Sequence, residues 1–77
     1  MNENMVGMKP GEPKMGIVID CKNLNVREQP NSSAAVLGVV PAGTELMVDD
    51  RESTDEFYKI LTASGLEGFC MNKFIMV

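Results

Sequence analysis

The sequence predicts an all-β fold, a small barrel of five to six short strands behind a flexible N-terminal arm. Apolar and polar residues alternate in short runs, which is the period of half-buried strands. Turn-forming residues, among them Pro30, Asn31 and Gly43, separate these runs. The 77 residues allow one small domain, and closing it into a barrel would leave few free sheet edges.

The first 15 residues show no such alternation and are expected to form the arm. They contain Pro10 and Pro13, which lack an amide donor, and charged residues that offer nothing to bury. A disordered tail is favoured over a docking strip built from the three methionines that follow the first residue, Met5, Met8 and Met15. We therefore divide the chain into a flexible arm over residues 1–15 and a barrel over residues 16–77.

Two alternating runs begin the barrel. The first spans residues 17–22, where β-branched residues dominate. In the second, Leu24 and Val26 are expected to point into the barrel, which leaves Asn25 and Arg27 outside. The later elements, in order, are a turn over residues 28–35, a strand over 36–40, a turn over 41–44, a strand over 45–49, an acidic loop over 50–56, a strand over 57–62, a tight turn over 63–65, a strand over 66–71, a helical turn over Asn72–Phe74 and a closing strand over Ile75–Val77.

The distribution of charge argues against several partners. The net charge of −4 is concentrated in residues 45–56, where six acids and one base give −5, so the remaining residues sum to +1. Without a basic patch, nucleic acid and anionic membranes are poor partners, because both are bound through Lys and Arg. No apolar run reaches the roughly 18 residues of a membrane helix, and the Met-Asn-Glu-Asn start shows no secretory signal pattern.

The composition also argues against catalysis, and we expect a protein that is not an enzyme and has no cofactor. Histidine is absent, which removes Cys-His and Ser-His-Asp nucleophiles and histidine-ligated metals. Cys21 and Cys70 fit neither a CxxC motif nor a zinc site. They form either a disulfide or two small buried apolar residues, and the second is favoured. The acidic residues near position 50 lack the spacing and glycine of a calcium-binding EF-hand loop, so a solvated hairpin tip is favoured and no metal site is predicted.

The segment LNVREQP at residues 24–30 resembles the Leu-Asn-Val-Arg-x-x-Pro signature of the bacterial Src homology 3 domains. Further segments match this family in order: Gly43-Thr44 before the strand at 45–48, Phe57-Tyr58-Lys59-Ile60, Gly68-Phe69-Cys70 and Phe74. The resemblance covers residues 16–77 and implies a small Src-homology-3-like barrel. It also implies a non-catalytic binding module that recognises bacterial cell-wall peptide or peptidoglycan.

The resemblance and the strand alternation together give a candidate ligand-binding site. Family members that bind cell wall often line a shallow groove with aromatic residues, and the two tryptophans usual in the family are Phe57 and Phe69 here. Alternation places both rings on the face opposite Ile60 and Cys70. The predicted ligand-binding residues are Asn25, Arg27, Phe57, Tyr58, Phe69 and Asn72. The alternative is that Phe57 and Phe69 only cover one end of the barrel.

A second class of function is left open, that of a structural or assembly protein in a phage virion or another multi-subunit particle. In that case the arm docks onto a neighbouring protein as an added strand, and the acidic loop sets partner choice by charge complementarity. The absence of a secretory signal favours this alternative, whereas the family signature favours wall recognition. Association with cell wall or virion is expected if the resemblance holds.

Overall fold

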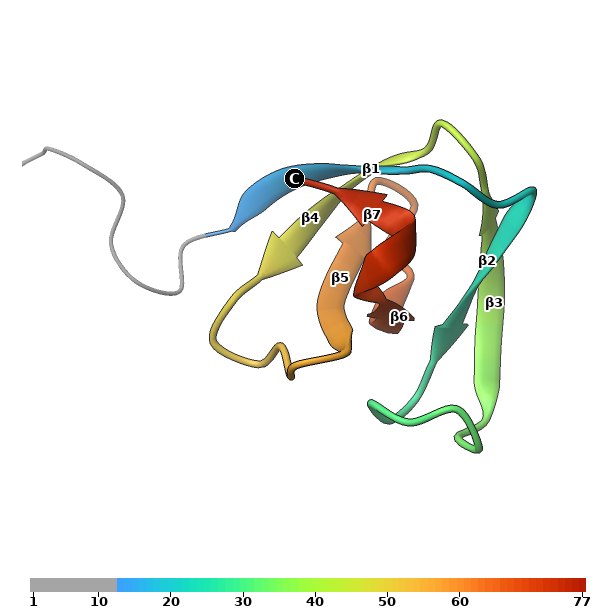
Figure 1. Cartoon of the computed structure of the whole chain (residues 1–77), viewed down its shortest axis with the longest axis vertical. Helices are drawn as coiled ribbons and strands as arrows, with labels where there is room; N and C mark the ends of the chain where they lie inside the picture. Colours follow the sequence, from blue (N-terminus) through green and yellow to red (C-terminus); the bar gives the residue numbers. More distant parts are fainter. Residues whose placement is uncertain (1–12) are drawn as a thin grey trace, which may run out of the picture.

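Seven strands joined by short turns make up residues 13–77, which are the residues that the computed structural model describes (Figure 1). The elements are β1 (Lys14–Val18), β2 (Asn23–Arg27), β3 (Val36–Pro41), β4 (Glu45–Asp49), β5 (Phe57–Thr62), β6 (Glu67–Met71), the 3-10 turn η1 (Asn72–Phe74) and β7 (Ile75–Met76). The all-β prediction is confirmed, as is the helical turn before the last strand. Within this part of the chain, no helix is long and apolar enough to cross a membrane.

The strands form one antiparallel sheet in the order β3-β2-β6-β5-β4-β1-β7. The sheet curls around a single core, so that Val40 of β3 and Ile75 of β7 belong to the same buried cluster. The prediction of a closed barrel needs correction, because β3 and β7 stand at the two ends of the order and do not pair with each other. Among residues 13–77, the sheet therefore keeps two strand edges without a neighbouring strand.

The core lies on the concave face of this sheet and follows the alternation read from the sequence. Leu24 and Val26 are buried, as predicted, while Asn25 between them is exposed. The complete core cluster is Val18, Leu24, Val26, Val40, Leu46, Val48, Ile60, Cys70 and Ile75. Both cysteines are free thiols, and Cys70 is fully buried. Burial of these side chains supplies the main stabilising term for a domain of this size.

The first strand differs from the prediction at both ends. It begins at Lys14, inside the segment assigned to the arm, and Met15 pairs with Met47 of β4. It ends at Val18, because Asp20 takes a left-handed φ of 58° that breaks the extended chain. The alternation expected through residue 22 is therefore interrupted. The rest of the predicted arm, residues 1–12, lies outside the described residues.

Gly43 and Gly68 occupy positions where a residue with a side chain would be unfavourable, for different reasons. Gly43 has a φ of +88° in the turn between β3 and β4, a conformation that favours glycine. Gly68 lies where β6 meets β2, and a Cβ placed there would sit 2.5 Å from the carbonyl oxygen of Arg27. The close approach of these two strands therefore depends on the missing side chain.

Candidate binding face

The strand register aligns the outward side chains of neighbouring strands into two rows on the convex face. The first outer row crosses β2, β6, β5 and β4 and consists of Arg27, Phe69, Lys59 and Asp49. The second outer row crosses β6, β5, β4 and β1 and consists of Glu67, Leu61, Met47 and Met15. Paired residues of antiparallel strands share a face, so each row is a continuous line of adjacent side chains. The first row is mainly charged, and the second is mainly apolar.

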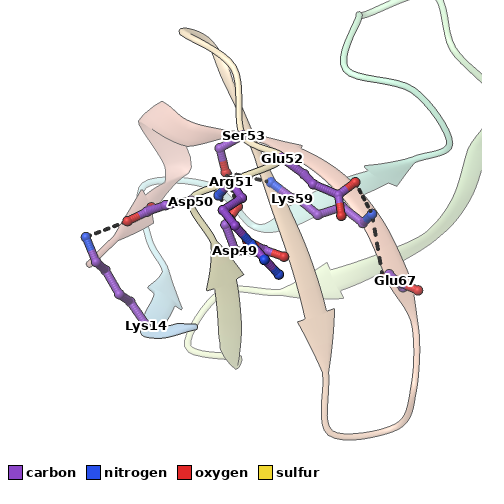
Figure 2. Close-up of polar contacts among 8 residues, drawn as sticks. All are labelled: Lys14, Asp49, Asp50, Arg51, Glu52, Ser53, Lys59 and Glu67. Atoms are coloured by element: carbon purple, nitrogen blue, oxygen red, sulfur yellow. Dashed lines mark hydrogen bonds and ion pairs between the residues drawn. The ribbon is translucent and has the colours of Figure 1, made fainter. Parts of the chain in front are cut away.

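Lys59 belongs to the first outer row and forms an ion pair with Glu67 of the second. Its side chain is only 16% exposed, and its Nζ lies 3.3 Å from Glu52 Oε1 and 3.6 Å from Glu67 Oε2 (Figure 2). The same ammonium sits 5.2 Å from the centre of the Phe69 ring, within the range of a cation–π contact. A lysine this far from water requires such partners.

The acidic loop between β4 and β5 is tied to the sheet by hydrogen bonds. The Ser53 hydroxyl donates to the Asp49 carbonyl at 2.8 Å, and its oxygen accepts the backbone amide of Lys59 at 3.1 Å. Lys14 Nζ lies 2.6 Å from Asp50 Oδ2 (Figure 2), and this hydrogen bond and charge raise the pKa of Lys14. No group of three His, Cys, Asp or Glu side chains within residues 13–77 is arranged to hold a metal.

A shallow hollow of about 180 Å³ lies between the two outer rows. Its lining includes Pro13, Met47, Asp49, Lys59, Leu61 and Glu67. A second hollow of similar size shares Met47 and Leu61 and extends towards Met15. We call this combined surface the outer groove. Its floor is apolar, and Leu61 is 45% exposed there.

The predicted aromatic residues do not lie together on this groove. Phe57 is on the convex face, opposite Met71 in the register, but its side chain is only 4% exposed and offers no ring to a ligand. Tyr58 points to the other face and packs against the core. Phe69 is half-buried beside Lys59, so it alone of the three borders the outer groove.

The predicted polar residues come from two elements, with Asn25 and Arg27 on β2 and Asn72 in η1. Arg27 Nη1 donates to the Ala34 carbonyl at 2.8 Å and thereby holds the β2–β3 loop. Asn72 Nδ2 donates to the Asp55 carbonyl at 2.8 Å and fastens the acidic loop to η1. Asn25 is exposed on β2. Arg27 and Phe69 are neighbours in the first outer row, but the six predicted residues do not all converge on one surface.

Residues of the outer groove were missed although the sequence carried a signal for them. Lys59 and Leu61 occupy the same strand parity as Phe57, so alternation alone places them on the convex face. The alignment of Met47 and Glu67 with Leu61 depends on the register of three strands. Sequence alternation does not give that register.

Comparison with known proteins adds one positive finding. The model of the bacterial SH3 domain family matches residues 22–76. No curated protein matches the chain. The matched segment runs from the residue before β2 to the last residue of β7. It therefore contains every strand of the two outer rows except β1.

Proposed function

Since the chain belongs to the bacterial SH3 domain family, we propose that it is a non-catalytic module that binds bacterial cell-wall peptide. The observation that carries the proposal is the outer groove, where an apolar floor of Met47 and Leu61 lies beside carboxylates. Concave surfaces with an apolar lining and a few placed polar groups are the usual form of ligand sites. Catalysis has no part in the proposal.

The charge of the groove favours a ligand that carries an ammonium group. Lys59 is the single cation between Glu52 and Glu67, so this cluster retains one negative charge. Asp49 does not add to this charge, because it accepts the Arg51 amide at 3.0 Å and its Oδ1 lies 3.8 Å from Nε of the exposed Arg51 guanidinium. A peptide with small apolar side chains and a free amino group fits this combination, and bacterial wall peptides have both features.

Phe69 provides the aromatic contact in this proposal. Its ring borders the cluster through the Lys59 ammonium at 5.2 Å. Stacking of a flat amide group or a sugar face against such a ring requires no indole donor. The role first assigned to two phenylalanines therefore falls to Phe69 alone, because Phe57 is buried.

Co-sedimentation with Gram-positive sacculi tests the proposal, with low-micromolar protein and the change Leu61→Thr. Threonine favours strands, and its smaller side chain removes part of the apolar floor of the groove. We expect about fivefold weaker retention, which corresponds to about 1 kcal/mol of lost apolar contact. Phe69→Ala is expected to weaken retention as well.

The matched control is Met76→Thr on β7, where the side chain is 58% exposed and outside the groove. It is expected to sediment like the unchanged protein. Equal retention of all the variants, in proteins shown to be folded by circular dichroism, would reject the outer groove. No retention of the unchanged protein would reject wall binding and favour the assembly alternative, which otherwise stays a prediction.

A further inference from the structure

Two methionines are neighbours on the outer groove. Met15 of β1 lies directly opposite Met47 of β4 in the strand register, so their side chains share a face and lie side by side. Met47 lines the first hollow of the groove, and both residues line the second. Met15 is 57% exposed, and Met47 is half-buried. The surface that the proposed function uses therefore carries two adjacent thioethers.

Among residues 13–77, the buried core contains no methionine. Its apolar members are Val, Leu, Ile, Phe and Cys side chains. The other two methionines in this part of the chain are Met71, which is half-buried on β6, and Met76, which is 58% exposed on β7. Neither of them lines the outer groove. A chemical change at these methionines therefore alters the surface of the domain and leaves its core side chains intact.

Methionine has one reaction that converts its apolar side chain into a polar one. Hydrogen peroxide transfers one oxygen atom to the thioether sulfur, which loses two electrons and becomes a sulfoxide. The O–O bond breaks, an S–O bond forms, and the second peroxide oxygen leaves as water with both hydrogens. A sulfoxide oxygen holds hydrogen-bonded water, and removing that water when an apolar ligand group docks costs free energy.

We propose that Met15 and Met47 form an oxidation site that controls ligand binding by the outer groove. The thioether form binds the ligand, and the sulfoxide form binds it much more weakly. This inference rests on the proposed function, because it concerns regulation of the same groove. The oxidant is a peroxide, and methionine sulfoxide reductases return the sulfoxides to thioethers. Met76 is as exposed as Met15 but lies outside the groove, so its oxidation leaves binding unchanged.

The two thiols are the competing targets of a peroxide. Cys70 is fully buried, and burial raises the pKa of its thiol to about 12, so it stays in the less reactive protonated form. Cys21 is half-buried. A thiol reductant added after the peroxide reverses sulfenic acids and disulfides but leaves methionine sulfoxides in place. This order of treatment separates the two kinds of sulfur.

Co-sedimentation of the full chain with Gram-positive sacculi tests the inference, before and after hydrogen peroxide followed by a thiol reductant. Peptide mapping by mass spectrometry gives the sulfoxide fraction at each methionine of the chain. We expect oxidation of Met15 and Met47 to weaken retention at least about fivefold, because the apolar floor becomes polar. The circular dichroism spectrum should stay the same, and methionine sulfoxide reductases should restore retention.

A double variant with Met15→Leu and Met47→Leu removes the oxidation site but keeps the groove apolar. Leucine is close to methionine in volume and forms no sulfoxide, so this variant should bind like the unchanged protein both before and after peroxide. Met76→Leu is the matched control and should lose retention after peroxide as the unchanged protein does. All other methionines and both cysteines are present in these variants, so oxidation elsewhere in the chain is controlled.

Three results would overturn the inference while leaving wall binding intact. The first is a double variant that loses retention after peroxide as the unchanged protein does. The second is unchanged retention of a protein that is fully oxidised at Met15 and Met47. The third is a Met47 that resists peroxide when Met76 is fully oxidised. If the untreated protein is not retained at all, the proposed function fails and this inference fails with it.

Discussion

The β4–β5 side of the domain and the β2–β3 hairpin differ in the side chains that they present to solvent. Both have a buried inner face and an outer face in contact with solvent. On the β4–β5 side, ion pairs through Lys59 and Lys14 organise the outer face and its loop. The β2–β3 hairpin has no charged residue between positions 30 and 44 and leaves Leu37 and Val39 exposed. The outer face is therefore ordered by charge on one side of the domain and is uncharged and apolar on the other.

The largest effect on stability is expected at the β2–β6 seam, where β6 pairs with β2 and the two regions meet. Gly68→Ala would place a Cβ 2.5 Å from the Arg27 carbonyl oxygen, which is backbone and cannot move aside easily. We expect a loss of about 3 kcal/mol of unfolding free energy, equivalent to a fall in Tm of more than about 10 °C. Thermal unfolding followed by circular dichroism measures it.

Gly38→Ala is the control for that change within the hairpin. Its Cβ would meet Leu66 Cδ2 at 3.0 Å, and that side chain is able to turn away. We expect a loss of less than about 1 kcal/mol. Equal losses for the two glycine variants would show that the β2–β6 seam is not specially tight.

Alkaline pH offers a second test of the core beneath this seam. Burial raises the pKa of the Cys70 thiol to about 12, from an ordinary value of 9.0, with a smaller contribution from Cys21. Because the folded pKa is the higher one, this contribution is complete below pH 9 and is lost as the pH rises towards 12. By pH 11 we expect about 2 kcal/mol to be lost.

Denaturant unfolding of Cys70→Ala at the same pH values isolates that contribution. The variant should start less stable, because it leaves a small cavity, but should lose less stability between pH 9 and 11 than the unchanged protein. Parallel losses in the two proteins would show that the thiol is not held neutral by its surroundings.

Removing the charge of Lys59, which lies between two carboxylates on the β4–β5 side, should have a moderate effect on stability. Lys59→Met keeps the apolar stem but leaves Glu52 and Glu67 without their shared cation. Because both carboxylates are mostly exposed, we expect a loss of about 1 kcal/mol that diminishes at high salt. Chemical denaturation at two salt concentrations measures it, with the exposed Lys22→Met as the control. A loss that does not depend on salt would contradict an ionic role.

The smallest effects are expected at exposed apolar positions. Leu61→Thr and Met76→Thr should each change the unfolding free energy by no more than about 0.5 kcal/mol. Thermal unfolding of both variants checks this. A large loss for Leu61→Thr would mean that this side chain is part of the core, and its use as a binding test would then fail.

Alternation and turn residues were enough to predict most of the fold. The runs at residues 45–49 and 57–62 became β4 and β5 with the expected bounds. Leu46 and Val48 alternate with less buried residues in the first run, and aromatic and aliphatic residues dominate the second. The end of β1 was not predictable, because it depends on the left-handed φ of Asp20, and aspartate adopts that conformation only in some contexts.

The candidate site was harder to predict than the fold. Alternation placed Phe57 and Phe69 on the convex face, and the register agrees. Sequence alone did not show that Phe57 would be buried there, because burial depends on which loop covers a strand end. Thr54, which exchanges backbone and side-chain hydrogen bonds with Phe57, lies in that loop. The outer groove likewise requires three strands in a fixed register.

Amide chemical shifts recorded during titration with soluble wall-peptide fragments are the most direct test of ligand binding at the outer groove. We expect the shifts that change to cluster at Met47, Lys59, Leu61, Glu67 and Phe69, while those of Val36 and Val39 stay in place. Movement confined to the β2–β3 hairpin, or no movement at millimolar peptide, would contradict the assignment of the outer groove as the ligand site.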